Sequence, residues 1–217
     1  MGLFSKRLLN EAVAALKTGG FLKSLYWTVF GYAGRNEFVL FRADLKKTGG
    51  YSGNGIPGLE LKTVDAEALG SLRENPAFRT KEAYADKYSS PSGCLVGMYR
   101  GEPAHLMWVF EKNGSSRFFT LLDREAEIGY CFTADRFRGK GIYTAMISGA
   151  LEYLKGRNFS AVYMATHVTN LPAIKAITRA GFEEAGRISH YGIFHRPKWN
   201  GNSREYEKCG GMDGTRG

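Results

Sequence analysis

Short segments of this chain that alternate between hydrophobic and polar residues, or are apolar throughout and bounded by turns, indicate β-strands. These segments lie at residues 59–64, 94–99, 105–110, 117–122 and 125–133. The turn at residues 100–103, Arg-Gly-Glu-Pro, is typical of a hairpin. A helix that starts after Asp65, and a helical segment at 81–88, fall between the first two strands. The pattern predicts an antiparallel meander.

Helical spacing replaces this alternation after Gly141. We expect a helix at 141–155, a strand at 161–168, a helix at 171–180 and further strands near Phe182 and Tyr191. Gly156 and Gly181 follow the two helices, as glycine commonly does at a helix C-terminus. The second half therefore has the order β-α-β-α-β, and the fold class is α/β.

Apolar residues also recur at helical spacing on both sides of Gly19-Gly20, so residues 1–33 are expected to form two short amphipathic helices. Two interpretations stay open: these helices pack against the main domain or a second subunit, or they bind peripherally to a membrane surface. We expect residues 1–47 to be an N-terminal helical extension and 48–57 a glycine-rich linker. Residues 58–198 then form the main domain, and 199–217 a disordered tail.

The composition of the 217 residues, with 43% hydrophobic and 13% aromatic, is typical of one folded domain with extensions. The net charge is +9, and the first 48 residues hold eight lysines and arginines against three acids. Such an excess attracts any polyanion and does not choose among them. Nucleic-acid binding by this segment is one hypothesis, but its basic residues show little aromatic interleaving, and we expect no nucleic-acid partner.

Cysteine usage and hydropathy suggest a location for the protein. Cys94, Cys131 and Cys209 are odd in number and lack CxxC spacing, which argues against a disulfide framework or a thiolate metal site. No apolar run reaches the roughly 18 residues that a membrane span needs. We therefore expect a cytoplasmic protein without a bound metal.

An anion-binding loop is predicted where the strand at 125–133 leads into the helix at 141–155. Backbone N–H groups at a helix N-terminus lack partners, and the helix dipole favours a negative charge there. Gly139 and Gly141 allow close approach of the backbone, and Arg138 and Lys140 add positive charge. A diphosphate is the expected ligand. The Walker and dinucleotide glycine motifs do not fit, because Gly141 and Thr144 stand at required positions.

The sequence at 138–143, Arg-Gly-Lys-Gly-Ile-Tyr, resembles the acyl-CoA loop of the GNAT acyltransferase superfamily, whose pattern is Gln/Arg-x-x-Gly-x-Gly/Ala. Tyr143 stands where Gly or Ala is usual, and an overlapping frame at 136–141 satisfies the pattern. A second landmark, Asn170-Leu-Pro-Ala followed by Gly181-Phe182, resembles the start and end of the family's fourth helix, although Asn170 also fits a plain helix N-cap. The resemblance covers residues 58–196.

The resemblance implies a GNAT fold, with a mixed, mostly antiparallel sheet, splayed fourth and fifth strands, and acetyl-CoA as co-substrate. It assigns cofactor-binding roles to the residues at the splay, the loop and the second landmark: Phe132, Thr133, Arg138, Gly139, Lys140, Gly141, Ile142, Tyr143 and Asn170. A backbone N–H near Phe132 and Thr133 would polarise the thioester carbonyl.

Glu127 is the first candidate for the general base, because it precedes Arg138 by the spacing that histone acetyltransferases of this superfamily use. Strand alternation places it on one face with Glu125, whose like charge would raise its pKa, and with Gly129, Cys131 and Thr133. The alternative is that both carboxylates are simply exposed acids. His167 is a second candidate base, near the end of the fifth strand, or a hydrogen-bonding residue only.

The acid that the family usually places seven residues after its asparagine is missing, since that position is Ile177. Tyr143 and Tyr191 are candidate substitutes, or are packing aromatics.

We expect direct transfer of acetyl to a primary amine, with Cys131 not acting as a nucleophile. A small amine or an amino sugar is favoured, because the loop variant and the N-terminal extension resemble GNAT proteins associated with polysaccharide synthesis. A non-catalytic acyl-CoA-binding module is the alternative, and a homodimer would suit the N-terminal helices.

Overall fold

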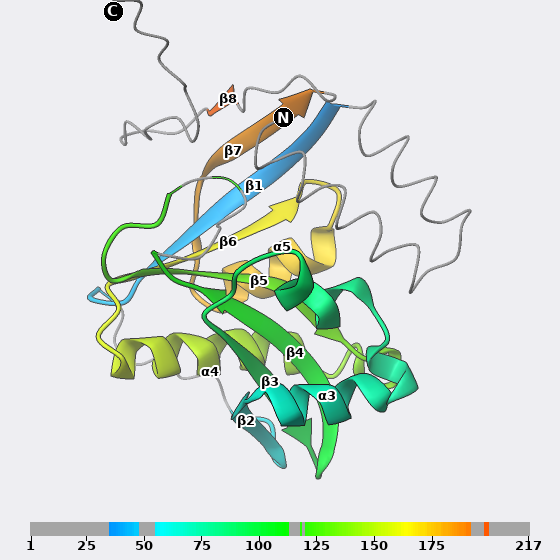
Figure 1. Ribbon diagram of the computed structural model, residues 1–217. Coiled ribbons are helices and arrows are strands. Elements are labelled where there is room, and N and C mark those ends of the chain that lie inside the picture. Colours follow the sequence, from blue (N-terminus) through cyan, green and yellow to red (C-terminus); the bar gives the residue numbers. More distant parts are fainter. Residues whose placement is uncertain (1–34, 48–54, 113–117, 119, 192–197, 200–217) are drawn as a thin grey trace, which may run out of the picture.

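All but one of the strand pairs in the sheet are antiparallel. The computed structural model describes residues 35–47, 55–112, 118, 120–191 and 198–199. Its eight-stranded sheet has the order β2-β3-β4-β5-β6-β1-β7-β8 (Figure 1). The strands are β1 (Arg35–Asp44), β2 (Leu59–Val64), β3 (Gly93–Tyr99), β4 (Glu102–Phe110), β5 (Glu125–Thr133), β6 (Ala161–His167), β7 (Glu183–Tyr191) and β8 (Lys198–Trp199). Only β5 and β6 run parallel. The fold class predicted from the sequence is confirmed.

Helices cover both faces of the sheet. They are α3 (Ala66–Glu74), the 3-10 turns η1 (Pro76–Phe78), η2 (Lys81–Lys87) and η3 (Asp135–Phe137), α4 (Ile142–Gly156) and α5 (Leu171–Arg179). The indole N–H of Trp108 on β4 donates to the carbonyl of Glu82 in η2, so even-numbered residues of β4 face η2. His105 on the same strand stacks on Tyr143 of α4 and faces the opposite way. The sheet therefore has an η2 face and an α4 face.

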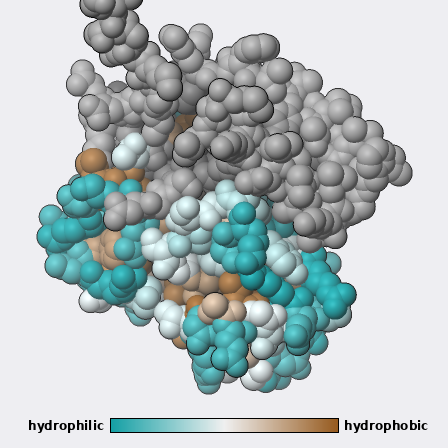
Figure 2. Space-filling view, in the orientation of Figure 1, coloured by the Kyte–Doolittle hydropathy of each residue, from teal (hydrophilic) through white to brown (hydrophobic). Residues whose placement is uncertain are grey.

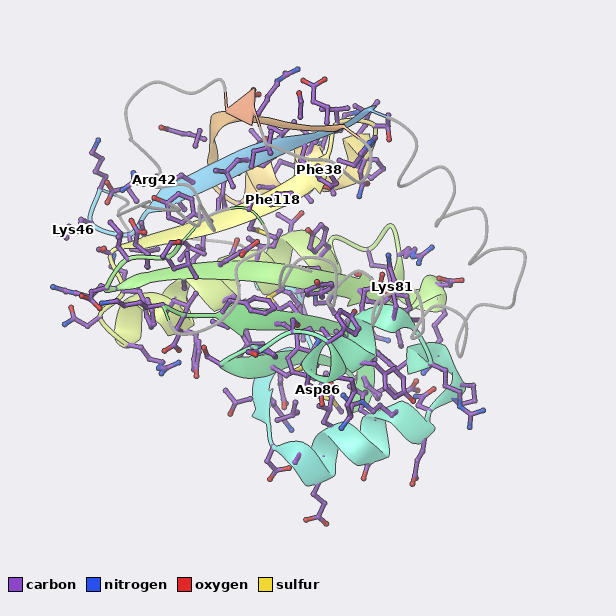
Figure 3. The ribbon with its side chains drawn as sticks, turned by 45° about the horizontal axis from the view of Figure 1, so that its top comes forward. Phe38, Arg42, Lys46, Lys81, Asp86 and Phe118 are labelled. Carbon is purple, nitrogen blue, oxygen red and sulfur yellow. The ribbon has the colours of Figure 1, made fainter. Side chains whose placement is uncertain are left out.

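Local sequence signals explain where several elements begin. The Asp65 carboxylate accepts a hydrogen bond from the Ala68 N–H at 2.8 Å and caps α3. Asn170 caps α5 in the same way, and Pro172 sits in its first turn. Arg73 of α3 donates to the Ala83 carbonyl and pairs with Asp86, which joins α3 to η2. Figure 3 labels Asp86 and Lys81, which both belong to η2.

The strand β1 departs from the sequence-based expectation. Residues 35–44 were assigned to a helical extension outside the main domain, whereas they form a strand between β6 and β7. Val39, Leu40 and Phe41 are all buried, as expected for a strand covered on both faces. The predicted helices at 1–33 and most of the linker lie outside the described residues, as do residues 200–217 of the tail.

Two further expectations differ from the structure. A strand was predicted at 117–122, but Phe118 and the described residues 120–122 belong to no strand. The Glu125 carboxylate accepts the Leu122 N–H at 3.0 Å, and Phe118 packs on Phe38 of β1 with 4.9 Å between ring centroids (Figure 3). Side-chain contacts therefore hold this segment in place of strand pairing. The separate strands near Phe182 and Tyr191 are one strand, β7.

The visible surface of the described residues is mostly hydrophilic, with hydrophobic residues showing between hydrophilic ones in its lower part (Figure 2). Leu122 and Leu171 are the large hydrophobic side chains most exposed among the described residues. None of the helices that the structure describes is long and apolar enough to cross a membrane.

Candidate functional site

The parallel strands β5 and β6 separate part-way along their length. They pair only at Glu125–Glu127 with Ala161–Tyr163. Beyond that point β5 continues beside β4, while β6 continues beside β1 (Figure 1). The backbone of β5 after Glu127 thus borders a gap on its β6 side, where its polar groups can meet a ligand. The splayed strands expected from the sequence are present.

A β-bulge lies in β5 at the splay. The pairing with β4 shifts between Leu106 and Trp108, so that Tyr130 and Cys131 oppose one residue of β4. Tyr130 has a φ of 48°, in the left-handed region that an aromatic residue rarely adopts. Its ring packs edge-on against Tyr88, which follows η2. The bulge bends β5 away from β6 and so opens the cleft.

The bulge also overturns one sequence-based expectation. Simple alternation placed Glu125, Glu127, Gly129, Cys131 and Thr133 on one face of the strand. In the structure Glu127 is paired with Phe110, and cross-strand partners share a face, so Glu127 lies on the η2 face. Thr133 is paired with His105 and lies on the α4 face. The extra residue at the bulge reverses the alternation, and the carboxylates are separated from Cys131 and Thr133.

A cleft of about 190 Å³ opens between the separated strands. Its wall is formed by β5, β6, the first turns of α4 and α5, and one residue of β4: Ile128, Gly129, Tyr130, Cys131, Thr133, Met164, Ala165, Thr166, Tyr143, Asn170, Ala173 and His105. Three sequence-predicted site residues, Thr133, Tyr143 and Asn170, meet here. The cleft meets the first turn of α4 at Tyr143, whereas residues 138–142 of the predicted anion loop do not line it.

The loop between β5 and α4 has the geometry of an anion cradle. Gly139 and Gly141 have φ values of 74° and 75°, which only glycine adopts without strain. Gly141 is the N-cap of α4 and supplies no side-chain cap, so the N–H groups of the first turn, including those of Ile142 and Tyr143, remain available. A diphosphate fits this position by charge and by hydrogen bonding.

Arg138 is less available to a ligand than the sequence suggested. Its guanidinium donates to the Thr133 carbonyl at 3.2 Å and pairs with Asp135 at 2.8 Å. The Lys140 ammonium instead lies over the rings of Tyr99 and Phe137, 5.7 and 5.3 Å from their centroids. Phe132, also assigned to the cofactor site, packs on Phe78 of η1 and does not line the cleft.

Tyr143, Cys131 and His105 form a cluster on the α4 side of the cleft, in which His105 is fully buried and the other two are half-buried. Burial raises the pKa of the Cys131 thiol to about 12, although its hydrogen bond with Tyr143 lowers it. Burial, together with the neighbouring Cys131, raises the pKa of Tyr143 well above its usual value. The Tyr143 ring stacks on His105 with centroids 5.5 Å apart. The thiol and the phenol therefore both stay protonated near neutral pH.

His105 is a site residue that the sequence did not reveal. Its side chain is fully buried, Nδ1 lies 2.7 Å from the Thr133 hydroxyl, and Nε2 has no hydrogen-bond partner. Burial lowers its pKa to about 3, so the imidazole is neutral. The sequence carries no signal for this role, because a single histidine inside an apolar strand belongs to no motif. His105 lies at the cleft because it is the cross-strand partner of Thr133.

The two carboxylates of β5 occupy different settings. Both are nearly fully buried, contrary to the alternative that they are exposed acids. Glu125 accepts hydrogen bonds from the Tyr163 hydroxyl at 3.2 Å and the Leu122 N–H at 3.0 Å, which makes it a structural residue. Glu127 pairs in register with Tyr163 at the point where β5 and β6 part. Glu127 therefore sits at the apex of the splay.

Asn170 lines the cleft, but His167 and Ile177 do not. His167 bonds the Thr169 hydroxyl through Nδ1 at 2.8 Å, packs edge-on against Phe38, and does not line the cleft. Ile177 is fully buried in the core. The backbone of Tyr191 lies at the end of β7, paired with β1. Among the described residues, no group of three or more His, Cys, Asp or Glu could hold a metal ion.

Comparison with known proteins agrees with this geometry. Residues 67–182 match the model of the acetyltransferase (GNAT) family. An uncharacterized N-acetyltransferase of Methanocaldococcus jannaschii is 46% identical over 87 residues, which cover 36% of this chain and 38% of that protein. The chain thus spans well under half of that relative's length.

Solved structures give the same fold. A GCN5-related N-acetyltransferase from Sphaerobacter thermophilus has a TM-score of 0.52 at 14% identity, over 78% of this chain and 55% of that one. A GCN5-related glucosamine N-acetyltransferase region of a fungal multi-domain β-N-acetylglucosaminidase has a TM-score of 0.53 at 13% identity, over 77% of this chain and 22% of that one. At such identities the likeness concerns the fold alone.

Proposed function

Because this chain belongs to the acetyltransferase (GNAT) family, we propose that it is an N-acetyltransferase that transfers an acetyl group from acetyl-CoA to a primary amine. The observation that carries this proposal is the cleft that opens between β5 and β6 directly after Glu127, in the strand that leads to the anion cradle. Glu127 itself is buried beside the cleft and does not line it. A long ligand with a diphosphate at one end and a reactive group at the other matches that arrangement.

The residues of the chain suit acetyl-CoA in three places. The N–H groups at the start of α4 and the loop glycines would hold its diphosphate. The open edge of β5 offers backbone hydrogen bonds to the extended arm of the ligand. An N–H group at the bulge, of Tyr130 or Cys131, would polarise the thioester carbonyl, because Thr133 lies roughly 17 Å along the strand from Glu127. Asn170 closes the cleft beside that arm. An acetyl group is the acyl group that we propose.

Glu127 is the residue that we propose as general base. Its carboxylate would take the proton that the amine must lose as its nitrogen bonds to the thioester carbon. The carbon–sulfur bond then breaks and leaves a thiolate on CoA. His167 is the less favoured base, because its ring is engaged by Thr169 and Phe38 away from the cleft.

Tyr143 is the residue that we propose to stabilise the departing thiolate. Its raised pKa keeps the phenol protonated, and the phenol lies at the cleft wall. A thiol with a pKa of about 8.5 already leaves readily as a thiolate, so the contribution of Tyr143 is a hydrogen bond rather than an obligatory proton transfer. Ile177 stands where the family usually has its acid, and its side chain is apolar and fully buried in the core. The group that assists the leaving thiolate must therefore be another residue.

Direct transfer without a covalent enzyme intermediate is the mechanism that we propose, and the protonated state of Cys131 supports it. A nucleophilic cysteine must be a thiolate, and a thiol whose pKa is about 12 is almost wholly protonated at neutral pH. The amine must therefore reach the thioester itself in a ternary complex.

The acceptor that we propose is a small amine such as an amino sugar. Support comes from the loop variant at 138–143 and from the glucosamine N-acetyltransferase region that shares the fold. The acceptor would approach the apex from the η2 face, where the carboxylate of Glu127 lies.

Calorimetric titration with acetyl-CoA, CoA and ATP, followed by a thiol-release assay against a panel of amino sugars, small amines and peptide N-termini, tests this function. We expect micromolar binding of acetyl-CoA, no binding of ATP, and release of thiol with at least one amine. Tight CoA binding without turnover of any amine would favour a non-catalytic acyl-CoA-binding module, which the absent family acid at Ile177 would explain. No binding of acetyl-CoA would overturn the proposal.

A further inference from the structure

Four cationic side chains lie on the anion loop or on the β3–β4 hairpin that packs against it, and two of them are paired with carboxylates. Arg136 pairs with Glu102 on the β3–β4 hairpin, and Arg138 pairs with Asp135 at 2.8 Å. A salt bridge reduces the attraction of a cation for a further anion, because the partner carboxylate repels it. The positive charge that remains available must come from the other two side chains, Lys140 and Arg100.

Arg100 and Lys140 share one aromatic ring. The guanidinium carbon of Arg100 lies 5.3 Å from the Tyr99 ring centroid, and the Lys140 ammonium lies 5.7 Å from the same centroid. Within the described parts of the chain, neither side chain forms an ion pair with a carboxylate. Cations gain modestly from resting on an aromatic face, and neither contact neutralises the positive charge. Both side chains therefore keep their charge for an anion that approaches this ring.

The backbone at Arg100 indicates that its position is imposed rather than preferred. Arg100 and Gly101 are the two central residues of the turn between β3 and β4, with φ values of 52° and 82°. Such a turn favours Asn-Gly or Gly-Gly, because other side chains are strained at positive φ. The Arg100 N–H donates to the Gly58 carbonyl at 2.7 Å, which fixes the turn. Asparagine would therefore suit this position of the turn better than arginine does.

We propose that Arg100 and Lys140 form a binding site for the 3′-phosphate of CoA, and so make the protein discriminate CoA from dephospho-CoA. This inference rests on the proposed binding of acetyl-CoA. The 3′-phosphate and the diphosphate are attached to the same ribose, so a diphosphate held at the start of α4 brings the 3′-phosphate close to the loop. Lys140 belongs to that loop, and the hairpin with Arg100 packs on it through Tyr99 and Phe137.

The phosphate monoester is the group that this pair suits best. It carries a charge of about −1.5 to −2 at pH 7 and presents three acceptor oxygens, enough to be shared by a guanidinium and an ammonium. A diphosphate diester lacks that second charge on either phosphorus. The hairpin arginine therefore distinguishes one end of the nucleotide rather than adding general affinity.

Arg100→Asn is the sharpest test, because asparagine suits the left-handed turn and removes the guanidinium without straining the fold. Calorimetric titrations compare CoA with dephospho-CoA in the unaltered chain, in this variant and in Arg79→Ala, a control at an exposed arginine away from the loop. We expect the unaltered chain to prefer CoA by about tenfold or more, and Arg100→Asn to lose most of that preference by weakening CoA alone. Arg79→Ala should change neither affinity.

The pH dependence gives a second readout that a purely structural role would not affect. The second pKa of a phosphate monoester is about 6, so the preference for CoA should decline between pH 7.5 and pH 5 in the unaltered chain and not in Arg100→Asn. Equal affinities of the unaltered chain for the two ligands would overturn the 3′-phosphate site and leave the proposed function standing, as would equal weakening of both by Arg100→Asn. Failure of both ligands to bind would overturn the proposed function itself.

Discussion

Glu127 of β5 and Tyr163 of β6 are the last pair of residues in register before those two strands part. One strand pair therefore provides both the rigid apex and the cleft that opens from it. Tyr163 also donates a hydrogen bond to Glu125, which places that carboxylate in a structural role and leaves Glu127 as the acid at the apex. The position of Glu127 is held by a packed sheet, as a group that must meet a reacting nitrogen requires.

Glu127→Gln is expected to lower kcat by about 10²- to 10⁴-fold, because the amide cannot accept a proton from the amine. The dissociation constant for acetyl-CoA should stay within about twofold, since the change is nearly isosteric and lies away from the anion loop. Thiol-release kinetics and calorimetry measure the two quantities. Glu60→Gln, an exposed carboxylate on β2, is the matched control and should leave both unchanged. Unaltered turnover in Glu127→Gln would move the base to another residue.

Cys131→Ala is expected to retain transfer within about threefold, since the thiol acts only as a small packing group at the cleft wall. With a pKa of about 12, only about 10⁻⁴ of the Cys131 side chain is thiolate at pH 8, so native alkylation by iodoacetamide should be slow. Mass spectrometry of the labelled peptides measures the rate, and unfolded protein supplies the reference. Isolation of an acetylated Cys131 during turnover would contradict direct transfer.

The elements from β5 to α5 could be predicted because their boundaries carry local signals. Asn170 caps α5, and Gly141 precedes α4 with a positive φ that glycine favours. The anion cradle was predicted for the same reason, since a strand, a glycine loop and a helix follow one another without interruption. Local chemistry was sufficient wherever the partner groups are close in the sequence.

Two features depend on distant partners and were missed. The run Phe38-Val39-Leu40-Phe41 is apolar on both faces, and such a run cannot be distinguished from a buried helix by periodicity. Its partners, β6 and β7, lie far later in the chain. The bulge at Tyr130 has no sequence mark, because tyrosine does not favour a positive φ. That single bulge separated Glu127 from Cys131, which strict alternation had placed together.

Leu40→Ala tests whether β1 is part of the folded domain. Leu40 is fully buried between β6 and β7, so removing its side chain should lower the free energy of unfolding by about 2–5 kcal/mol. Leu122→Ala, at a leucine whose residue is 48% exposed, should change it by no more than about 0.5 kcal/mol. Urea unfolding followed by circular dichroism compares the two. Equal midpoints would mean that residues 35–44 do not contribute to the core.

His105 is expected to make the stability of the protein depend on pH in the acidic range. Its pKa is about 3 in the folded state, against about 6.5 for an ordinary histidine, so only the unfolded chain binds a proton between these values. Stability from this residue is therefore complete above pH 6.5 and is lost progressively as the pH falls toward 3.

The corresponding measurement is the difference in unfolding free energy between pH 7 and pH 4.5, which should include about 2 to 3 kcal/mol from His105. Other titrating groups contribute equally in His105→Gln, so subtracting the pH effect in that variant isolates the histidine term. The variant is less stable at pH 7 because the bond to Thr133 and the packing on Tyr143 change, but its decline with acid should be shallower. An equal decline in both proteins would show that the imidazole is protonated in the folded state, and that Nε2 finds an acceptor at the cleft.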